Sequence, residues 1–156
     1  MNKQANAARQ QADLFIQSNR FANARTIYQQ LCSNDHADEE AWFILGSLNG
    51  RLELFEESAK AYLHCLSLRP DWPEAISGSA AALVQLRRYA EAEPLFRQAL
   101  KLKPELANNY QGLATCLFQQ GKLADAQQAS EASIKHMPTF IPAYLTLAEI
   151  HWRRNS

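Results

Sequence analysis

Apolar side chains recur along this chain at the spacing of an amphipathic helix, in short runs that are interrupted at regular intervals. One run comprises Trp42, Leu45, Leu48 and Leu52, and after a brief break the same spacing resumes at Phe55. Side chains three or four residues apart lie on one face of a helix, so each run predicts a helix with one buried side. Two runs with a short break between them predict a pair of antiparallel helices.

Several unlike landmarks recur every 34 residues, which is hard to obtain by chance. Prolines follow this period at Pro70, Pro104 and Pro138. Two columns of small residues keep the same register: Ala24, Ser58, Ala92 and Ala126, and Ala12, Gly46, Ala80 and Ala114. A column of large residues consists of Trp42, Ile76, Tyr110 and Tyr144. Because proline lacks an N–H group and disfavours helix in the residue before it, the prolines are expected to end the second helix of each pair.

These columns resemble the tetratricopeptide repeat (TPR), whose pattern is W-x-x-L-G-x-x-Y, then A-x-x-x-F, then P. The best copy has Trp42-x-x-Leu45-Gly46, followed by Ser58, Tyr62 and Pro70. The resemblance implies an all-α fold, an α-α superhelix (a TPR solenoid) of about four and a half repeats in one domain, 1–156. The repeats are expected at about 5–38, 39–72, 73–106 and 107–140, with a final first helix at 141–154.

Four residues depart from the family pattern, and they predict softer packing where they lie. Asn49 stands in place of Tyr, Ser79 in place of Leu, and Ser130 and Ser133 stand where bulky residues are usual. Large and small side chains must alternate where two helices pack closely, so a short polar side chain fills such a place poorly. The departures do not predict a different fold.

The resemblance also implies which residues face a binding groove lined by the first helices. Carried over by position, the predicted partner-binding residues are Phe43, Ser47, Arg51, Ser77, Ala81, Gln85, Asn108, Gln111, Thr115, Phe118, Gln119, Glu149 and Trp152. The set is rich in apolar and neutral side chains, which favours a protein or peptide partner that offers apolar groups. As an alternative, Phe43 and Phe118 complete the core between helices.

Two ligand-binding modes known in the family are not supported by the residues. The Lys, Asn and Arg clamp for a terminal carboxylate is absent from the corresponding positions. An asparagine ladder at the sixth position of each repeat is also absent, since that column holds Gln10, Ile44, Gly78, Gly112 and Thr146. The identity of the partner therefore stays open.

Charge and cysteine content narrow the classes of partner and site. Lys and Arg number 16, as do Asp and Glu, so no net charge favours nucleic acid or an anionic membrane. Arg87, Arg88, Arg97, Lys101 and Lys103 make the third repeat locally basic, which we interpret as a solvated surface rather than a nucleic-acid contact. Three cysteines without C-x-x-C spacing predict reduced thiols. No apolar stretch suits an export signal or a membrane span, so we expect a cytoplasmic protein without metal or cofactor.

Candidate catalytic residues are few, and the sequence predicts no enzyme. The chain lacks a Gly-rich phosphate loop, a G-x-S-x-G elbow and an H-E-x-x-H pair. Cys32 and His36 are four residues apart, but two ligands do not make a metal site. His64 and Cys65 are adjacent and so point in different directions on one helix. We expect all four to be structural.

The last predicted helix, 141–154, is apolar around much of its circumference, whereas a terminal capping helix should have a polar outer face. Two functions from different classes follow. The chain is expected to be a protein–protein interaction scaffold, or else the N-terminal regulatory or substrate-recruiting domain of a larger glycosyltransferase- or sulfotransferase-like enzyme. The apolar helix also suggests self-association, which sedimentation would exclude by showing a monomer at high concentration.

Overall fold

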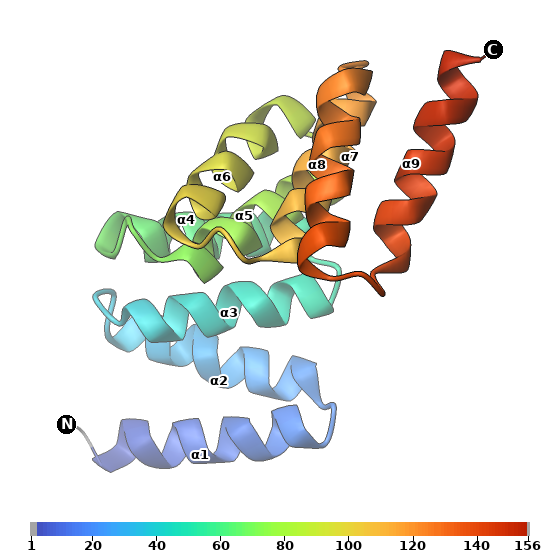
Figure 1. Cartoon of the computed structure of the whole chain (residues 1–156). Helices are drawn as coiled ribbons and strands as arrows, with labels where there is room; N and C mark the ends of the chain where they lie inside the picture. Colours follow the sequence, from blue (N-terminus) through green and yellow to red (C-terminus); the bar gives the residue numbers. More distant parts are fainter. Residues whose placement is uncertain (1–2, 156) are drawn as a thin grey trace. The chain divides into compact units, whose positions relative to one another are not determined.

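The computed structural model describes residues 3–155, and every regular element in that range is an α-helix (Figure 1). The helices are α1 (Lys3–Gln17), α2 (Phe21–Asn34), α3 (Glu39–Arg51), α4 (Phe55–Leu68), α5 (Pro73–Gln85), α6 (Tyr89–Leu102), α7 (Ala107–Gln119), α8 (Leu123–His136) and α9 (Ile141–Arg154). The starts of α3, α5, α7 and α9 coincide with the residues at which the period of 34 places the repeats. The expected all-α array of about four and a half repeats is confirmed.

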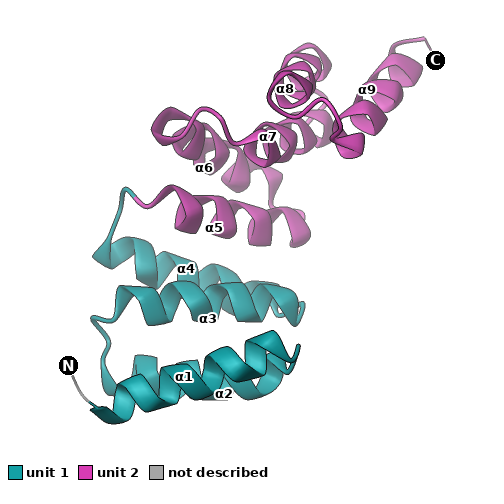
Figure 2. Ribbon diagram, turned by 60° about the horizontal axis from the view of Figure 1, so that its bottom comes forward, with its two compact units in different colours: residues 1–71 teal, residues 72–156 magenta. Residues whose placement is uncertain are grey.

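The helices form two compact units, coloured separately in Figure 2. Unit 1 spans residues 1–71 and contains α1 to α4, with α2 packed on both α1 and α3, and α3 on α4. Unit 2 spans residues 72–156 and contains α5 to α9, in which each helix packs on the next and α7 also contacts α5 and α9. Each unit has its own cluster of buried apolar side chains.

The turn inside each helix pair is built on a residue with left-handed backbone conformation. These residues are Asn19 (φ 58°), Glu53 (φ 59°), Arg87 (φ 58°) and Gly121 (φ 77°), again 34 positions apart. In the second repeat, the Leu54 N–H donates to the Asn49 carbonyl at 2.9 Å. Bonds of this kind satisfy carbonyl groups at a helix end. Only the fourth turn has the glycine for which this conformation carries no steric cost.

Large and small side chains alternate where the helices pack. The Tyr62 ring lies so close to Gly46 that a Cβ atom at that position would be 3.0 Å from three of its atoms. In unit 2 the Phe96 ring lies against Gly112 of the next repeat, where a Cβ atom would be 2.3 Å from Cζ. The rings of Tyr62 and Phe96 therefore fill space that Gly46 and Gly112 leave open.

The serines that replace bulky residues differ in how they are accommodated. Ser133 is buried, and its hydroxyl donates to the Ala107 carbonyl at 2.9 Å. Ser79 and Ser130 are equally buried, but their Oγ atoms have no hydrogen-bond partner among the described residues. A buried hydroxyl without a partner lowers stability, so the family pattern is least well satisfied at these two positions.

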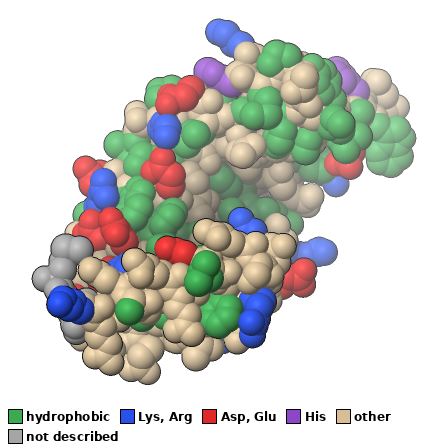
Figure 3. Space-filling model, turned by 90° about the horizontal axis from the view of Figure 1, so that it is seen from below, with side chains coloured by type: hydrophobic (Ala, Val, Ile, Leu, Met, Phe, Trp, Pro, Cys, Tyr) green, Lys and Arg blue, Asp and Glu red, His purple; other side chains and the backbone are tan. Residues whose placement is uncertain are grey.

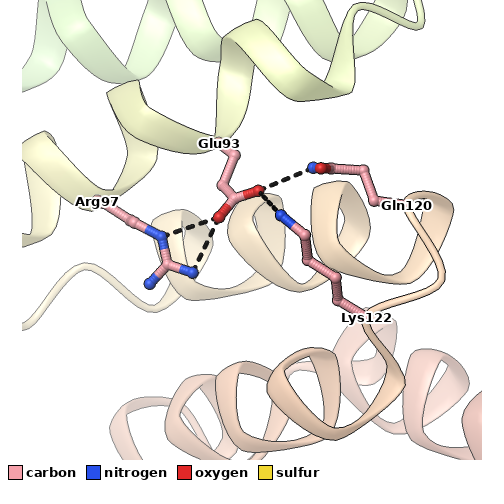
Figure 4. A network of polar contacts seen from close by, with 4 residues as sticks. All are labelled: Glu93, Arg97, Gln120 and Lys122. Atoms are coloured by element: carbon pink, nitrogen blue, oxygen red, sulfur yellow. Dashed lines mark hydrogen bonds and ion pairs between the residues drawn. The ribbon is translucent and has the colours of Figure 1, made fainter.

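A half-buried carboxylate, Glu93 of α6, joins this helix to the turn between α7 and α8 (Figure 4). It accepts hydrogen bonds from Arg97 Nη2 at 2.9 Å, Gln120 Nε2 at 2.9 Å and Lys122 Nζ at 2.8 Å. The bond from Lys122, aided by Gln120 and Arg97, lowers the pKa of Glu93 to about 2, although partial burial opposes the shift. Gln120 and Lys122 lie in the turn between α7 and α8, on either side of Gly121, so the network anchors that turn to α6.

Candidate functional site

The candidate site in unit 2 is a hollow of about 360 Å³ between the first helices α5 and α7, which we call the α5–α7 hollow. It is lined by Ser77, Gly78, Ala81, Val84, Gln85, Phe96, Asn108, Asn109 and Gly112. Four of the predicted partner-binding residues therefore lie together there: Ser77, Ala81, Gln85 and Asn108. None of its lining residues, all within the described range, carries a charge.

Small residues give the hollow its depth. Gly78 and Ala81 of α5 face it, as does Gly112 of α7, and none of them has a long side chain that would fill the space. Phe96 of α6 reaches the hollow from behind, and its ring is 4% exposed. Ser77 adds little outward polarity, because its hydroxyl donates to the Pro73 carbonyl of its own helix at 2.8 Å. The result is an apolar floor with the amide side chains of Gln85 and Asn108 exposed around it.

Asn109 was not predicted as a site residue, yet it lines the hollow. Its side chain is 4% exposed, and its Nδ2 atom has no hydrogen-bond partner in the part of the chain that the structure describes. A signal was present in the sequence, because the same column holds alanine in the other repeats, at Ala7, Ala41, Ala75 and Ala143, and the last three are fully buried. A single polar residue in a column of alanines is a departure from the repeat.

Three predicted residues on α7 are engaged in packing rather than open to a ligand. Gln111 donates from Nε2 to Thr146 Oγ1 of α9 at 2.8 Å, and Thr115 donates to the Gln111 carbonyl at 3.0 Å. Phe118 is 7% exposed and belongs to the core of unit 2, with the Arg153 guanidinium 4.3 Å from its ring centroid. The interpretation of Phe118 as an exposed groove residue is therefore wrong, and the alternative, a place in the interhelix core, is confirmed.

The other predicted residues of unit 2 lie on exposed surface. Gln119 at the end of α7 and Glu149 of α9 are exposed, and Trp152 is 72% exposed. The rest of α9 shows the apolar surface expected from its sequence, with Ile141 67% and Leu145 61% exposed. Self-association through this helix stays a prediction.

The remaining three predicted residues are in unit 1. Phe43 is half-buried, with its ring edge-on to that of Tyr62 at a centroid distance of 5.7 Å, and Ser47 is half-buried on the same helix. The Arg51 guanidinium is exposed on one side and lies 5.0 Å from the Phe21 ring centroid. The Phe43 side chain thus packs on Tyr62 and also keeps some exposed surface.

Unit 1 has a larger hollow of about 740 Å³ between α1, α2 and the start of α3. In contrast to the α5–α7 hollow it contains charged groups, including Arg9, Asp35, Asp38 and Glu40. Arg9 and Asp38 form an ion pair with each other. Asp38 also accepts a hydrogen bond from the Ala41 N–H at 3.0 Å and so caps α3. These contacts give Arg9 and Asp38 structural roles.

Comparison with known proteins agrees with this architecture. Two family models, both described as tetratricopeptide repeat, match residues 9–73 and 83–147. The chain belongs to the tetratricopeptide repeat family. No curated protein matches the sequence. Among solved structures, MamA from Desulfovibrio magneticus RS-1 superposes with a TM-score of 0.94 at 18% identity, over 99% of this chain and 88% of that chain.

Two further solved structures support the same fold. Another structure of MamA superposes with a TM-score of 0.87 at 20% identity, covering 92% of this chain and 84% of that chain. YrrB, described as "a TPR protein with an unusual peptide-binding site", superposes with a TM-score of 0.82 at 18% identity, covering 95% of this chain and 76% of that chain. At these identities the likeness shows the TPR fold.

Basic side chains of the third repeat lie close to acidic ones. Acidic and basic side chains are interspersed on the face drawn in Figure 3. In the third repeat, Arg88 pairs with Glu91 at 2.7 Å, Arg97 with Glu93 at 2.9 Å and Lys103 with Glu74 at 3.0 Å. Among the described residues, no helix has the length and apolar character needed to cross a bilayer.

Two histidines, His36 and His64, are candidate chemical groups together with their cysteine neighbours. The described residues contain no cluster of three or more metal-ligating side chains. His64 Nε2 lies 3.0 Å from the His36 carbonyl, and its ring packs on Trp42 at a centroid distance of 4.1 Å. His64 of α4 therefore packs against α3 and against the loop that precedes α3.

The three thiols are expected to be unreactive in the folded chain. Burial raises the pKa of Cys32 and Cys116 to about 12 and that of Cys65 to about 11, and the thiolate is the reactive form. With a chromogenic disulfide reagent at pH 8, we expect three thiols per chain to react in denaturant and none to react rapidly in buffer. An Ala90→Cys variant, with its thiol on an exposed face, should have one thiol that reacts rapidly in buffer. Rapid reaction of a native thiol would contradict the burial described.

Proposed function

We propose that this TPR chain is a protein-interaction scaffold that binds a peptide segment of a partner in the α5–α7 hollow. The observation that carries the proposal is the convergence of Ser77, Ala81, Gln85 and Asn108 on one uncharged, apolar-floored hollow. Surfaces of this kind suit an extended or helical segment that offers apolar side chains, with neutral amides at the rim for its main-chain groups. The fold that the chain shares with YrrB, a peptide-binding TPR protein, also supports it.

The more distant predicted residues extend this proposal. Gln119, Glu149 and Trp152 are exposed on α7 and α9, the helices that follow in the same unit, and they provide a tryptophan and neutral or acidic groups for a longer ligand. Large aromatic side chains frequently carry much of the binding energy at protein interfaces. Phe43, Ser47 and Arg51 lie in unit 1 and are not needed for binding in the α5–α7 hollow.

A random-peptide display library selected on the immobilised chain would test this function. We expect selected peptides to lose at least about tenfold in affinity for an Ala81→Arg variant, because the long charged side chain occupies the hollow. Ala81 is exposed on α5, so this variant should keep its fold, which circular dichroism would verify. Ala90→Arg, the same change on the exposed surface of α6, is the matched control and should bind like the wild type.

Two results would overturn the proposal. Peptides that bind Ala81→Arg with wild-type affinity would show that the site lies elsewhere, in the hollow of unit 1 or on α9. A library from which no specific peptide is enriched would argue against peptide binding as the function.

A further inference from the structure

The third residue of α3, α5 and α9 is a packing position, and Asn109 is the polar residue at this position in α7. Ala41, Ala75 and Ala143 occupy the position in α3, α5 and α9, each with 0% exposure, and Asn109 is 4% exposed. Nothing in the packing of the other repeats requires more than a methyl group there. Asn109 therefore places an amide in an environment that elsewhere holds only apolar atoms.

The amide of Asn109 is only partly satisfied in the folded chain. Its Nδ2 group can donate two hydrogen bonds, and within residues 3–155 it finds no acceptor. A buried donor without an acceptor lowers stability, because it gives up its hydrogen bonds to water on folding. An alanine would avoid this cost, so the stability of unit 2 does not explain the asparagine.

The position of Asn109 connects the missing acceptor to the candidate site. The residue lines the α5–α7 hollow, on the same helix as Gly112 and close to the Phe96 floor. The Nδ2 atom itself has no access to solvent, so the side chain has to turn towards the hollow to meet an acceptor there. Such an acceptor would then relieve the unsatisfied donor, while the group that carries it would cover apolar surface. An acceptor on an uncharged ligand fits best, because no lining residue offers a counter-charge and a buried unpaired charge is strongly unfavourable.

We propose that Asn109 donates a hydrogen bond to a main-chain carbonyl of an extended, locally uncharged peptide segment, whose neighbouring apolar side chain lies over Phe96. The proposal deepens the proposed function and rests on it. Gln85 and Asn108 at the rim are amides, which can both donate to and accept from the main-chain groups that follow along the segment. Recognition then depends on backbone position and on the absence of charge rather than on a terminal carboxylate.

The test measures the Kd of library-selected peptides for the wild type and for Asn109→Ala. We expect at least about tenfold weaker binding by the variant, together with a melting temperature no lower than that of the wild type. Asn23→Ala, on the exposed surface of α2, is a matched control with unchanged binding. The enriched peptides should lack Asp, Glu, Lys and Arg at one fixed position.

Backbone esters in the best peptide identify the acceptor, since replacing an amide by an ester weakens the adjacent carbonyl as an acceptor. One ester should weaken binding to the wild type but have little effect on Asn109→Ala, which is the signature of direct coupling in a double-mutant cycle. A structural role for Asn109 would instead make every ester act equally on both proteins, and that result would overturn the proposal.

The remaining outcomes separate this inference from the proposed function. If Asn109→Ala binds like the wild type while Ala81→Arg does not, the hollow is the site and the role of Asn109 is wrong. If neither variant changes the Kd, or if no peptide is enriched, both proposals fail.

Discussion

Replacing Gly112 by alanine is expected to lower the free energy of unfolding by about 1–2 kcal/mol. The new Cβ atom would lie 2.3 Å from Phe96 Cζ and 2.5 and 2.7 Å from the two Cε atoms. The ring is 4% exposed within the core cluster of unit 2, so it cannot move aside without disturbing its neighbours. Overpacking of this kind costs roughly 1–3 kcal/mol, which exceeds the gain of up to about 1 kcal/mol from the higher helix propensity of alanine. Urea unfolding would measure the difference.

Gly50 is the matched control for this substitution. It also lies in a helix, but a Cβ atom there would meet only Ser58 Oγ, at an ordinary 3.4 Å. Gly50→Ala should therefore be neutral or stabilising by up to about 1 kcal/mol. A Phe96→Leu change should reduce the cost of Gly112→Ala, because it removes the atoms that clash. Equal effects of alanine at positions 50 and 112 would contradict the proposed cause.

The repeat architecture was predictable from the sequence because the features that specify it are local. Helical spacing of apolar residues, and prolines two residues beyond the ends of α4, α6 and α8, place the helices almost to the residue. The left-handed turn residues were not predicted, because Asn19, Glu53 and Arg87 occupy positions where glycine would have been the signal. There the hydrogen bonds of the turn impose the conformation.

The candidate site was predictable only in part, because exposure depends on the neighbouring helices. Of the residues obtained by carrying family positions onto the chain, Ser77, Ala81, Gln85 and Asn108 line one hollow. The same procedure placed Phe118 in the groove, but α9 packs on α7 and Arg153 lies over the ring, so this side chain is buried.

Asn109 illustrates the opposite case, in which the sequence carried a signal that the family pattern does not interpret. The alanine column marks the residue as unusual, whereas the missing acceptor and the adjacent hollow are properties of the packed helices. Comparison of residues within a column of repeats can thus identify candidates, and the structure then shows which of them lie at a surface that a ligand can reach.

Substituting Glu93 by glutamine is expected to destabilise the chain by about 1–3 kcal/mol at pH 7 and to make its stability less sensitive to acid. Hydrogen bonds from Lys122, Gln120 and Arg97 favour the carboxylate, so the pKa of Glu93 in the folded chain is about 2, compared with an ordinary 4.5. A lowered pKa means that the stabilisation is complete above pH 4.5 and is lost as the pH falls towards 2. Arg97 and Lys122 are about half exposed, so solvent screening keeps the effect below what the shift alone would give.

Urea unfolding of both proteins at pH 7, 4.5 and 3 would test this prediction, because the difference between them should decrease steadily towards low pH. The comparison isolates Glu93, since every other titrating group is present in both chains. Glu131→Gln is the matched control: this carboxylate is exposed on α8 and accepts a bond from Gln127 at 2.8 Å within the same helix. It should show only a small difference at pH 7, because an exposed carboxylate contributes little to stability. A difference for Glu93→Gln that stays constant from pH 7 to 3 would mean that the side chain contributes through packing rather than through its charge, and that the network does not anchor the α7–α8 turn electrostatically.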